Sequence, residues 1–256
     1  MRIVIKVGTS TLAYSTGRLN IRQMEHICKV ISDIKNSGYE IILVSSGAVG
    51  MGMGKLSLNK RPTELSLKQA AAAVGQCELM YTYDKLFSEY NHTVAQILLT
   101  AYDINHDNCR ENFINTMNEL LKLGALPIVN ENDTVATNEL VIGDNDTLAA
   151  IVAKNVGADL LVLMSDIDGL FTADPHVDFE AKLISCIEKI TPEIEALAGE
   201  AGSQVGTGGM KTKIKAAKIV TSSGCDMLIV NGKDPDVLYD IVEGKKVGTL
   251  FLKESK

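Results

Sequence analysis

The chain has 256 residues, a formal net charge of −7 and five cysteines that lie far apart. The negative charge argues against general binding to nucleic acid or to anionic membranes, and the cysteine spacing excludes common zinc and thioredoxin-like motifs. The sequence has neither a secretory signal pattern nor an apolar run as long as a membrane span. We therefore expect a cytoplasmic protein that folds as a single domain over residues 1–256.

Short apolar runs alternate with segments of helical periodicity along the chain. The first helix is expected to begin after Asn20, an N-cap with Gln23 placed for a capping box, and to end at Gly38. Strands are predicted at residues 2–7, 40–45, 93–100, 125–130, 158–164 and 226–230, and further helices at about 64–90, 107–123, 145–156 and 211–223. This alternation predicts an α/β fold with a mostly parallel sheet covered on both faces. The stretch 165–210 is least regular and is expected to contain short strands and loops.

In such a sheet, ligands bind beyond the carboxyl ends of the strands. The loops predicted there are all rich in small and polar residues: "KVGTST", "SSGAVGMGMG", "NENDTVATNELVIGDND" and "SDIDGLFTADP". Their agreement predicts that a ligand site lies at this edge of the sheet.

The first two loops are compatible with anion binding. Lys6 ends the first strand and Gly8 and Thr9 follow, which favours a site of backbone N–H groups plus an ammonium. The alternative is a lysine that extends from a strand end into water. Ser46 is followed by Gly47, either at the start of an anion-binding helix or in a flexible turn.

The third loop gathers acidic residues and asparagines. Asn145 and Asp146 are placed to cap the next helix, and acceptor side chains beside free amides suit a substrate with both an ammonium and a carboxylate. Solvated turns and a divalent-metal site are the alternatives. The acidic residues are Glu131, Asp133, Asp144 and Asp146.

The last two segments point to a nucleotide or to plain loops. Ser165 and Asp166 either precede a hairpin or contact a nucleotide. In "VGTGGMKTKIKAA" (205–217), glycines precede two lysines at a helix start, which favours an anion site over an exposed loop. It is not a P-loop, because Met210 separates Gly209 from Lys211.

Six segments in this order resemble the amino acid kinase family: "IVIKVGTSTL", "VSSGAVGMG", "VNENDTVAT", "GDNDTLAA", "SDIDGLFTADP" and "VGTGGMKTKIKAA". The third and sixth are most similar to the branch that phosphorylates glutamate. The resemblance covers essentially the whole chain. It implies a three-layer αβα sandwich around a mostly parallel sheet of about eight strands, with an N-terminal part that binds substrate and a C-terminal part that binds nucleotide.

The resemblance also implies an activity and a set of residues. The activity is transfer of phosphate from ATP, with Mg²⁺, to the γ-carboxylate of L-glutamate, the first step of proline biosynthesis. Lys6 and Lys213 match the lysines that hold the phosphates, and Asp146 matches the aspartate that orients them. The positions that match glutamate binding are Ser46, Asp133 and Asn145. The positions that match nucleotide binding are Lys6, Gly8, Thr9, Ser165, Asp166, Thr207, Gly208, Gly209, Met210, Lys211, Thr212 and Lys213. No metal ligand is assigned.

Further expectations come from the family. Many members carry a C-terminal PUA domain, which we expect to be absent here, and members commonly form dimers or tetramers and are inhibited by proline. Other kinases of this fold, acting on N-acetylglutamate, aspartate, carbamate or UMP, are alternatives. A non-catalytic sensor of ATP and an amino acid is another, although retention of Lys6, Lys213 and Asp146 argues against it.

Overall fold

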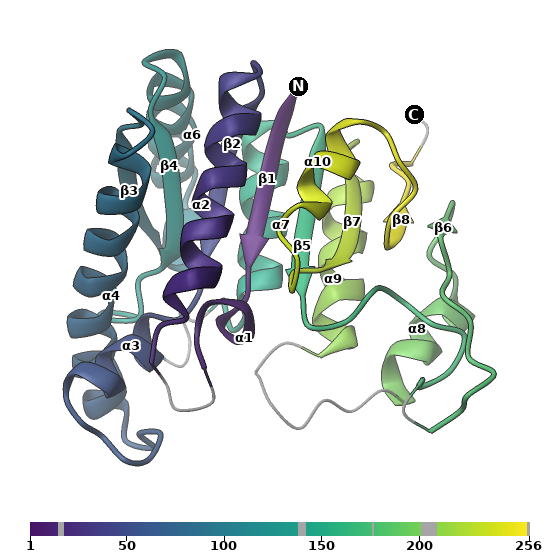
Figure 1. Cartoon of the computed structure of the whole chain (residues 1–256), viewed down its shortest axis with the longest axis horizontal. Helices are drawn as coiled ribbons and strands as arrows, with labels where there is room; N and C mark the ends of the chain where they lie inside the picture. The colour runs from purple at the N-terminus through teal and green to yellow at the C-terminus, as the bar shows by residue number, and fades with distance from the viewer. Residues whose placement is uncertain (15–17, 138–141, 176, 201–208, 255–256) are drawn as a thin grey trace.

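The protein is built on one eight-stranded sheet, seen in a computed structural model that describes residues 1–14, 18–137, 142–175, 177–200 and 209–254 (Figure 1). The strand order is β3-β4-β2-β1-β5-β7-β8-β6, and every neighbouring pair is parallel except β7 with β8. The strands are β1 (Arg2–Val7), β2 (Glu40–Ser45), β3 (Val94–Leu99), β4 (Leu126–Glu131), β5 (Leu160–Ser165), β6 (Cys186–Ile187), β7 (Asp226–Asn231) and β8 (Thr249–Phe251). The predicted mostly parallel sheet of about eight strands is confirmed.

Helices cover both faces of this sheet, which completes the predicted three layers (Figure 1). One face packs against α2 (Ile21–Asn36), α4 (Leu65–Ser88) and α10 (Val237–Val242), and the other against α6 (Asp107–Lys122), α7 (Asn145–Val156) and α9 (Met210–Thr221). Alternate residues of β1 serve the two layers: Ile3 and Ile5 are buried on the α2 side and Val4 on the α7 side. The remaining helices are short or glycine-rich and were not predicted with these bounds: α1 (Thr9–Leu12), α3 (Ala48–Lys55), α5 (Ala101–Asn105) and α8 (Pro192–Glu200).

The start of α2 confirms one local prediction and corrects another. The side chain of Asn20 accepts a hydrogen bond from the backbone N–H of Gln23, and Gly38 after the helix has φ of 101°. The capping box was wrong, because the side chain of Gln23 donates instead to the carbonyl oxygen of Gly232 at 2.7 Å. A tertiary acceptor within reach of this long side chain replaces the local one.

The start of α7 also differs from the prediction. Asp144 is the N-cap, and its Oδ1 accepts from the backbone N–H of Thr147 at 2.7 Å. Asn145 and Asp146, expected to cap the helix, lie inside its first turn. Because Asp144 already caps the helix, both of their side chains are available for tertiary contacts.

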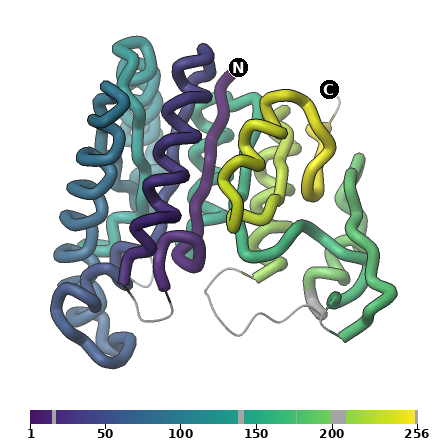
Figure 2. Tube along the Cα trace, viewed as in Figure 1, coloured from purple at the N-terminus to yellow at the C-terminus, as the bar shows by residue number. Residues whose placement is uncertain are grey.

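The irregular stretch after β5 runs from the end of that strand toward the edge of the sheet that carries β8 and β6, as the green tube in Figure 2 shows. Its described part contains the bridge between Phe171 and Leu183, the short β6, and α8, a helix that the sequence analysis did not predict. None of the described helices is both long and apolar enough to cross a membrane.

Candidate active site

The carboxyl ends of β1, β2, β4 and β5 meet at the edge of the sheet where α1, α3, α7 and α9 begin (Figure 1). This is the edge at which open parallel sheets bind ligands. The structure brings most of the described candidate residues to it.

Asp146 lies between two lysines that come from opposite halves of the chain. Its Oδ1 lies 2.7 Å from Nζ of Lys6 on β1, and its Oδ2 lies 3.1 Å from Nζ of Lys213 on α9. Thr212 adds a hydroxyl that donates to the same Oδ2 at 2.8 Å. All three charged residues are buried, with 8% of Lys6, 1% of Asp146 and 3% of Lys213 exposed. We call these three residues the lysine–aspartate cluster.

The charges in this cluster favour an anionic ligand. Burial opposes ionisation of Asp146, but the two ammonium groups outweigh it and lower the pKa of this carboxyl to about 2. Asp146 is therefore ionised at neutral pH, and one carboxylate faces two ammonium groups. A phosphate or carboxylate that binds beside these ammonium groups interacts strongly with them, because the surroundings are buried.

Small residues keep the surroundings of Lys6 open. Gly8 follows Lys6 at the N-cap of α1, and a Cβ there would lie 3.3 Å from Nζ of Lys6, tighter than an ordinary contact. Thr9 and Ser10 are exposed beyond it. The glycine therefore lets the backbone pass close to the ammonium.

The first turn of α9 directs Lys211 and Lys213 to different surroundings. Gly209 is the N-cap, Met210 is buried in the apolar core, and Lys211 is exposed, whereas Lys213 is directed into the lysine–aspartate cluster. Helical geometry explains the difference, because residues two apart face different sides of a helix. Thr207 and Gly208 lie outside the described residues.

Two of the three predicted substrate residues are in direct contact. Nδ2 of Asn145 donates to Oγ of Ser46 and to the carbonyl oxygen of Ser45, both at 2.8 Å. Asp133 lies instead in the loop after β4, half-buried, with Oδ1 3.7 Å from Nζ of Lys68 on α4. Burial raises the pKa of Asp133, and Lys68 partly opposes that rise.

Asp133 lines a small hollow of about 10 Å³ between α3, α4 and the loop after β4. A hollow of about 530 Å³ elsewhere, on the outer side of α2 and α4, is lined by none of the candidate residues and is open to solvent. The larger hollow therefore does not mark the candidate site. The site lies where the charged and hydrogen-bonded candidate residues meet.

Sequence reasoning missed two polar residues behind Asn145. Asn130 at the end of β4 and Gln76 on α4 are buried, and Nδ2 of Asn130 donates to Oε1 of Gln76 at 2.8 Å. Gln76 stands in an alanine-rich helical segment, where no local pattern marks it. Asn130 lies within "VNENDTVAT", but its side chain has no local pattern that assigns it a specific role.

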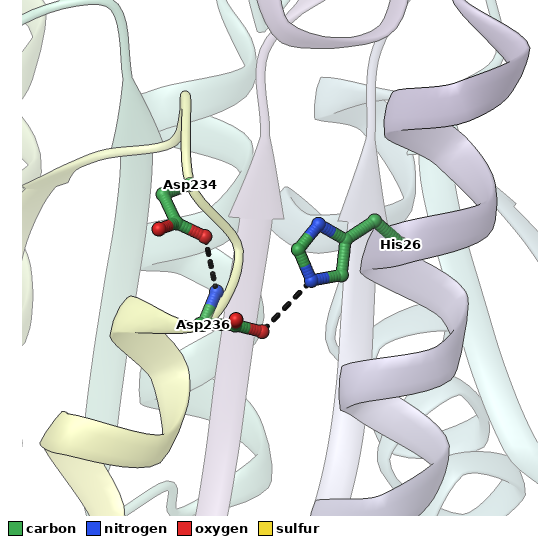
Figure 3. Close-up of side chains that lie close together, drawn as sticks. All are labelled: His26, Asp234 and Asp236. Carbon is green, nitrogen blue, oxygen red and sulfur yellow. Dashed lines mark hydrogen bonds and ion pairs between the residues drawn. The ribbon is translucent and has the colours of Figure 1, made fainter.

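The alternative of a metal site in the third loop gains no support from the described residues. Each of the four carboxylates has its own partner. Asp144 caps α7 and Asp146 faces the lysines. Glu131 accepts from the N–H of Ile142 at 2.6 Å, and Asp133 pairs with Lys68. The group with metal-ligand spacing among the described residues lies elsewhere, on α2 and the loop before α10 (Figure 3). It consists of His26, Asp234 and Asp236.

Two contacts connect the members of that group. Nε2 of His26 lies 2.8 Å from Oδ1 of Asp236, and the backbone N–H of Asp236 donates to Asp234 at 3.1 Å (Figure 3). Both aspartates are exposed. With the hydrogen bond from Gln23 to Gly232, these contacts connect α2 to the loop after β7.

The candidate nucleotide residues after β5 lie beside the same loop. Ser165 is buried, and its carbonyl oxygen accepts from the N–H of Gly232 at 2.7 Å. Asp166 is exposed and accepts from the hydroxyl of Ser165 at 3.2 Å. The chain therefore turns outward after Ser165 and leaves the carboxylate of Asp166 in solvent.

The sequence model of the amino acid kinase family matches residues 1–231. The chain belongs to the amino acid kinase family. It is 55% identical over 249 residues to a glutamate 5-kinase of Clostridium tetani, covering 97% of this chain and 93% of that protein. It is 51% identical over 255 residues to the glutamate 5-kinase of Clostridium perfringens, covering 98% of this chain and 95% of that one.

A solved structure agrees with the fold. Carbamate kinase from Giardia lamblia, bound to AMP-PNP, superposes with a TM-score of 0.72 at 16% identity, over 99% of this chain and 98% of that one. At this identity the likeness supports the amino acid kinase fold and says nothing about the substrate.

Proposed function

We propose that this protein transfers the γ-phosphoryl group of ATP to the γ-carboxylate of L-glutamate, forming L-glutamyl 5-phosphate in the first step of proline biosynthesis. The observation that carries the proposal is the lysine–aspartate cluster, in a chain that shares 55% identity with a curated glutamate 5-kinase. Transfer of a phosphoryl group between two anions needs positive charge and alignment more than covalent chemistry from the protein.

The reaction requires no general base. The γ-carboxylate of glutamate is ionised at neutral pH, so it attacks the γ-phosphorus as it is bound, and the bond to the ADP oxygen breaks in line. Lys6 and Lys213 neutralise the charge on the transferring oxygens. Asp146 holds the two ammonium groups in place, because each of its oxygens forms an ion pair with one of them.

We assign substrate binding to the N-terminal part and nucleotide binding mainly to the C-terminal part. Ser46 and Asn145 contact each other at 2.8 Å and are expected to bind glutamate, while the carboxylate of Asp133 suits its ammonium group. The residues expected to bind ATP are Lys6, Gly8, Thr9, Ser165, Asp166 and the segment Thr207–Lys213.

Mg²⁺ is expected to arrive with the nucleotide. In the described residues, the carboxylate nearest the lysines, Asp146, is occupied by two ammonium groups and a hydroxyl, and no group of three acidic, histidine or cysteine ligands lies beside it. Such a site fits an ion held mainly by phosphate oxygens, where it offsets phosphate charge. We also propose, from the family resemblance, inhibition by proline and a homodimer or homotetramer, which proline titration and sedimentation would test.

The test is formation of the acyl phosphate. Purified protein is incubated with Mg-ATP, L-glutamate and hydroxylamine and assayed for glutamyl hydroxamate. The alternative substrates are tested by ADP release: N-acetylglutamate, aspartate, carbamate and UMP. We expect glutamate-dependent hydroxamate, and we expect Lys213→Ala to lower kcat by about 10²–10³-fold. The matched control is Lys218→Ala, an exposed lysine on the same helix, which should stay near wild type. ADP release without hydroxamate, or a folded Lys213→Ala with normal turnover, would contradict the proposal.

A further inference from the structure

Three side-chain amides connect α4 to the start of α7 through β4. Oε1 of Gln76 accepts from Nδ2 of Asn130 at 2.8 Å, and Oδ1 of Asn130 accepts from Nδ2 of Asn145 at 3.1 Å. Gln76 is 7% exposed and Asn130 is 3% exposed, whereas Asn145 is half-buried. We call these three residues the amide relay.

Two backbone groups fix which end of each amide faces which neighbour. The carbonyl oxygen of Ser45 can only accept, so the group of Asn145 that faces it at 2.8 Å must be the NH₂. The backbone N–H of Glu131 can only donate, so the group of Asn130 that faces it at 2.9 Å must be the oxygen. The nitrogen of Asn130 then faces α4, and Gln76 must present its oxygen. The polarity of the amide relay follows from the ends of β2 and β4.

This polarity leaves one buried donor unused. Nε2 of Gln76 has no hydrogen-bond partner in the described part of the chain, although it is buried. An unsatisfied buried donor lowers the stability of the fold, so glutamine is unfavourable at position 76 unless its oxygen has a role. The hydrogen bond that this oxygen accepts from Asn130 gives it such a role, which is to hold Asn130.

The polarity also determines what Asn145 offers a ligand. Its nitrogen is directed to Ser45, Ser46 and Asn130, which leaves Oδ1 as the end available to accept a hydrogen bond. Asp133 supplies a carboxylate at the same edge of the sheet. Two acceptors suit a positively charged amino group and offer nothing to a substrate that lacks one.

We propose that Gln76 is a positioning residue that, through Asn130, holds the oxygen of Asn145 toward the substrate and so favours a substrate with a free ammonium group. The inference rests on the proposed function and adds a determinant of substrate selectivity to it. Gln76 also lines the small hollow beside Asp133, but the hydrogen bond that it makes is with Asn130, so we assign it a role through the amide relay and not in the chemical step.

The experiment compares L-glutamate with glutarate, the same diacid without the amino group. The kcat/KM for glutamate comes from the hydroxamate assay, and glutarate is measured as a substrate or, failing turnover, as a competitive inhibitor. Gln76→Met removes the acceptor for Asn130 at similar volume, whereas Gln76→Glu keeps an acceptor. Gln23→Met, which removes an amide that donates to Gly232 in the loop after β7, is the matched control.

We expect Gln76→Met to raise KM for glutamate about five- to tenfold, the effect of one lost hydrogen bond, with little change in kcat. The KM or inhibition constant for glutarate should stay the same, so the preference for glutamate over glutarate falls by the same five- to tenfold. Gln76→Glu and Gln23→Met should keep the wild-type preference.

An unchanged preference in a folded Gln76→Met would overturn the inference, and so would equal losses for both ligands, which indicate a general structural role. A wild type that forms no glutamyl hydroxamate would overturn the proposed function instead. In that case, the affinities for glutamate and glutarate are measured by calorimetry. A ratio of the two affinities that is the same in wild type and Gln76→Met would overturn the inference. Absence of glutamate binding to the wild type would overturn it as well.

Discussion

Asp146→Asn tests the electrostatic balance of the lysine–aspartate cluster. The substitution keeps the shape of the side chain but leaves two buried ammonium groups without their shared carboxylate. The lowering of the pKa of Asp146 from 3.8 to about 2 corresponds to about 2 kcal/mol in favour of the ionised form. Removing one partner from a buried charge pair costs about 3–5 kcal/mol in other proteins. We expect the free energy of unfolding to fall by about 2–4 kcal/mol at pH 7.

The pH dependence has a definite sign. Because the pKa of Asp146 is lower in the folded than in the unfolded chain, its stabilising contribution is complete above about pH 5 and is lost as the pH falls through about 2. The difference between wild type and Asp146→Asn should therefore be constant near neutral pH and smaller at pH 3.

Urea unfolding followed by far-ultraviolet circular dichroism measures this difference at both pH values. Glu119→Gln, which breaks an exposed pair with Lys122, is the control and should change stability by less than about 1 kcal/mol. Equal urea midpoints for wild type and Asp146→Asn at pH 7, or a difference that grows toward pH 3, would refute the reasoning.

Two predictions concern packing around the substrate side of the site. Gly75→Ala would place a Cβ 1.7 Å from the carbonyl oxygen of Ala48, so α3 and α4 must separate. We expect the free energy of unfolding to fall by about 1–3 kcal/mol, which a lower Tm would show. Gly50→Ala is the control, since its nearest neighbour would be 4.0 Å away, and a Tm equal in both variants would contradict the tight contact. Tyr83→Phe removes a buried hydroxyl that lies 2.8 Å from Oγ of Ser45, and we expect a loss of about 1 kcal/mol in urea unfolding; unchanged stability would mean that this hydrogen bond is not maintained in solution.

The central strands could be predicted because their residues carry the signal themselves. β1, β2, β4 and β5 are almost continuously apolar and buried, so composition alone marked them. The glycine-rich segment of α3 could not be assigned to a helix with the same clarity, because glycine disfavours helices. Its contact with α4, where Gly52 and Gly75 allow the backbones to touch, is a tertiary feature.

The strand pattern of the sequence predicts that Lys6, Asp146 and Lys213 lie at one edge of a parallel sheet, and the resemblance to the amino acid kinase family singles them out there. Only the tertiary structure decided that one carboxylate meets both ammonium groups, since that depends on the strand order and on how α7 and α9 pack. It also decided the role of Gln76, which no motif marked. The polarity of an amide is set by the backbone groups around it, and these come together only when β2, β4 and α4 are in place.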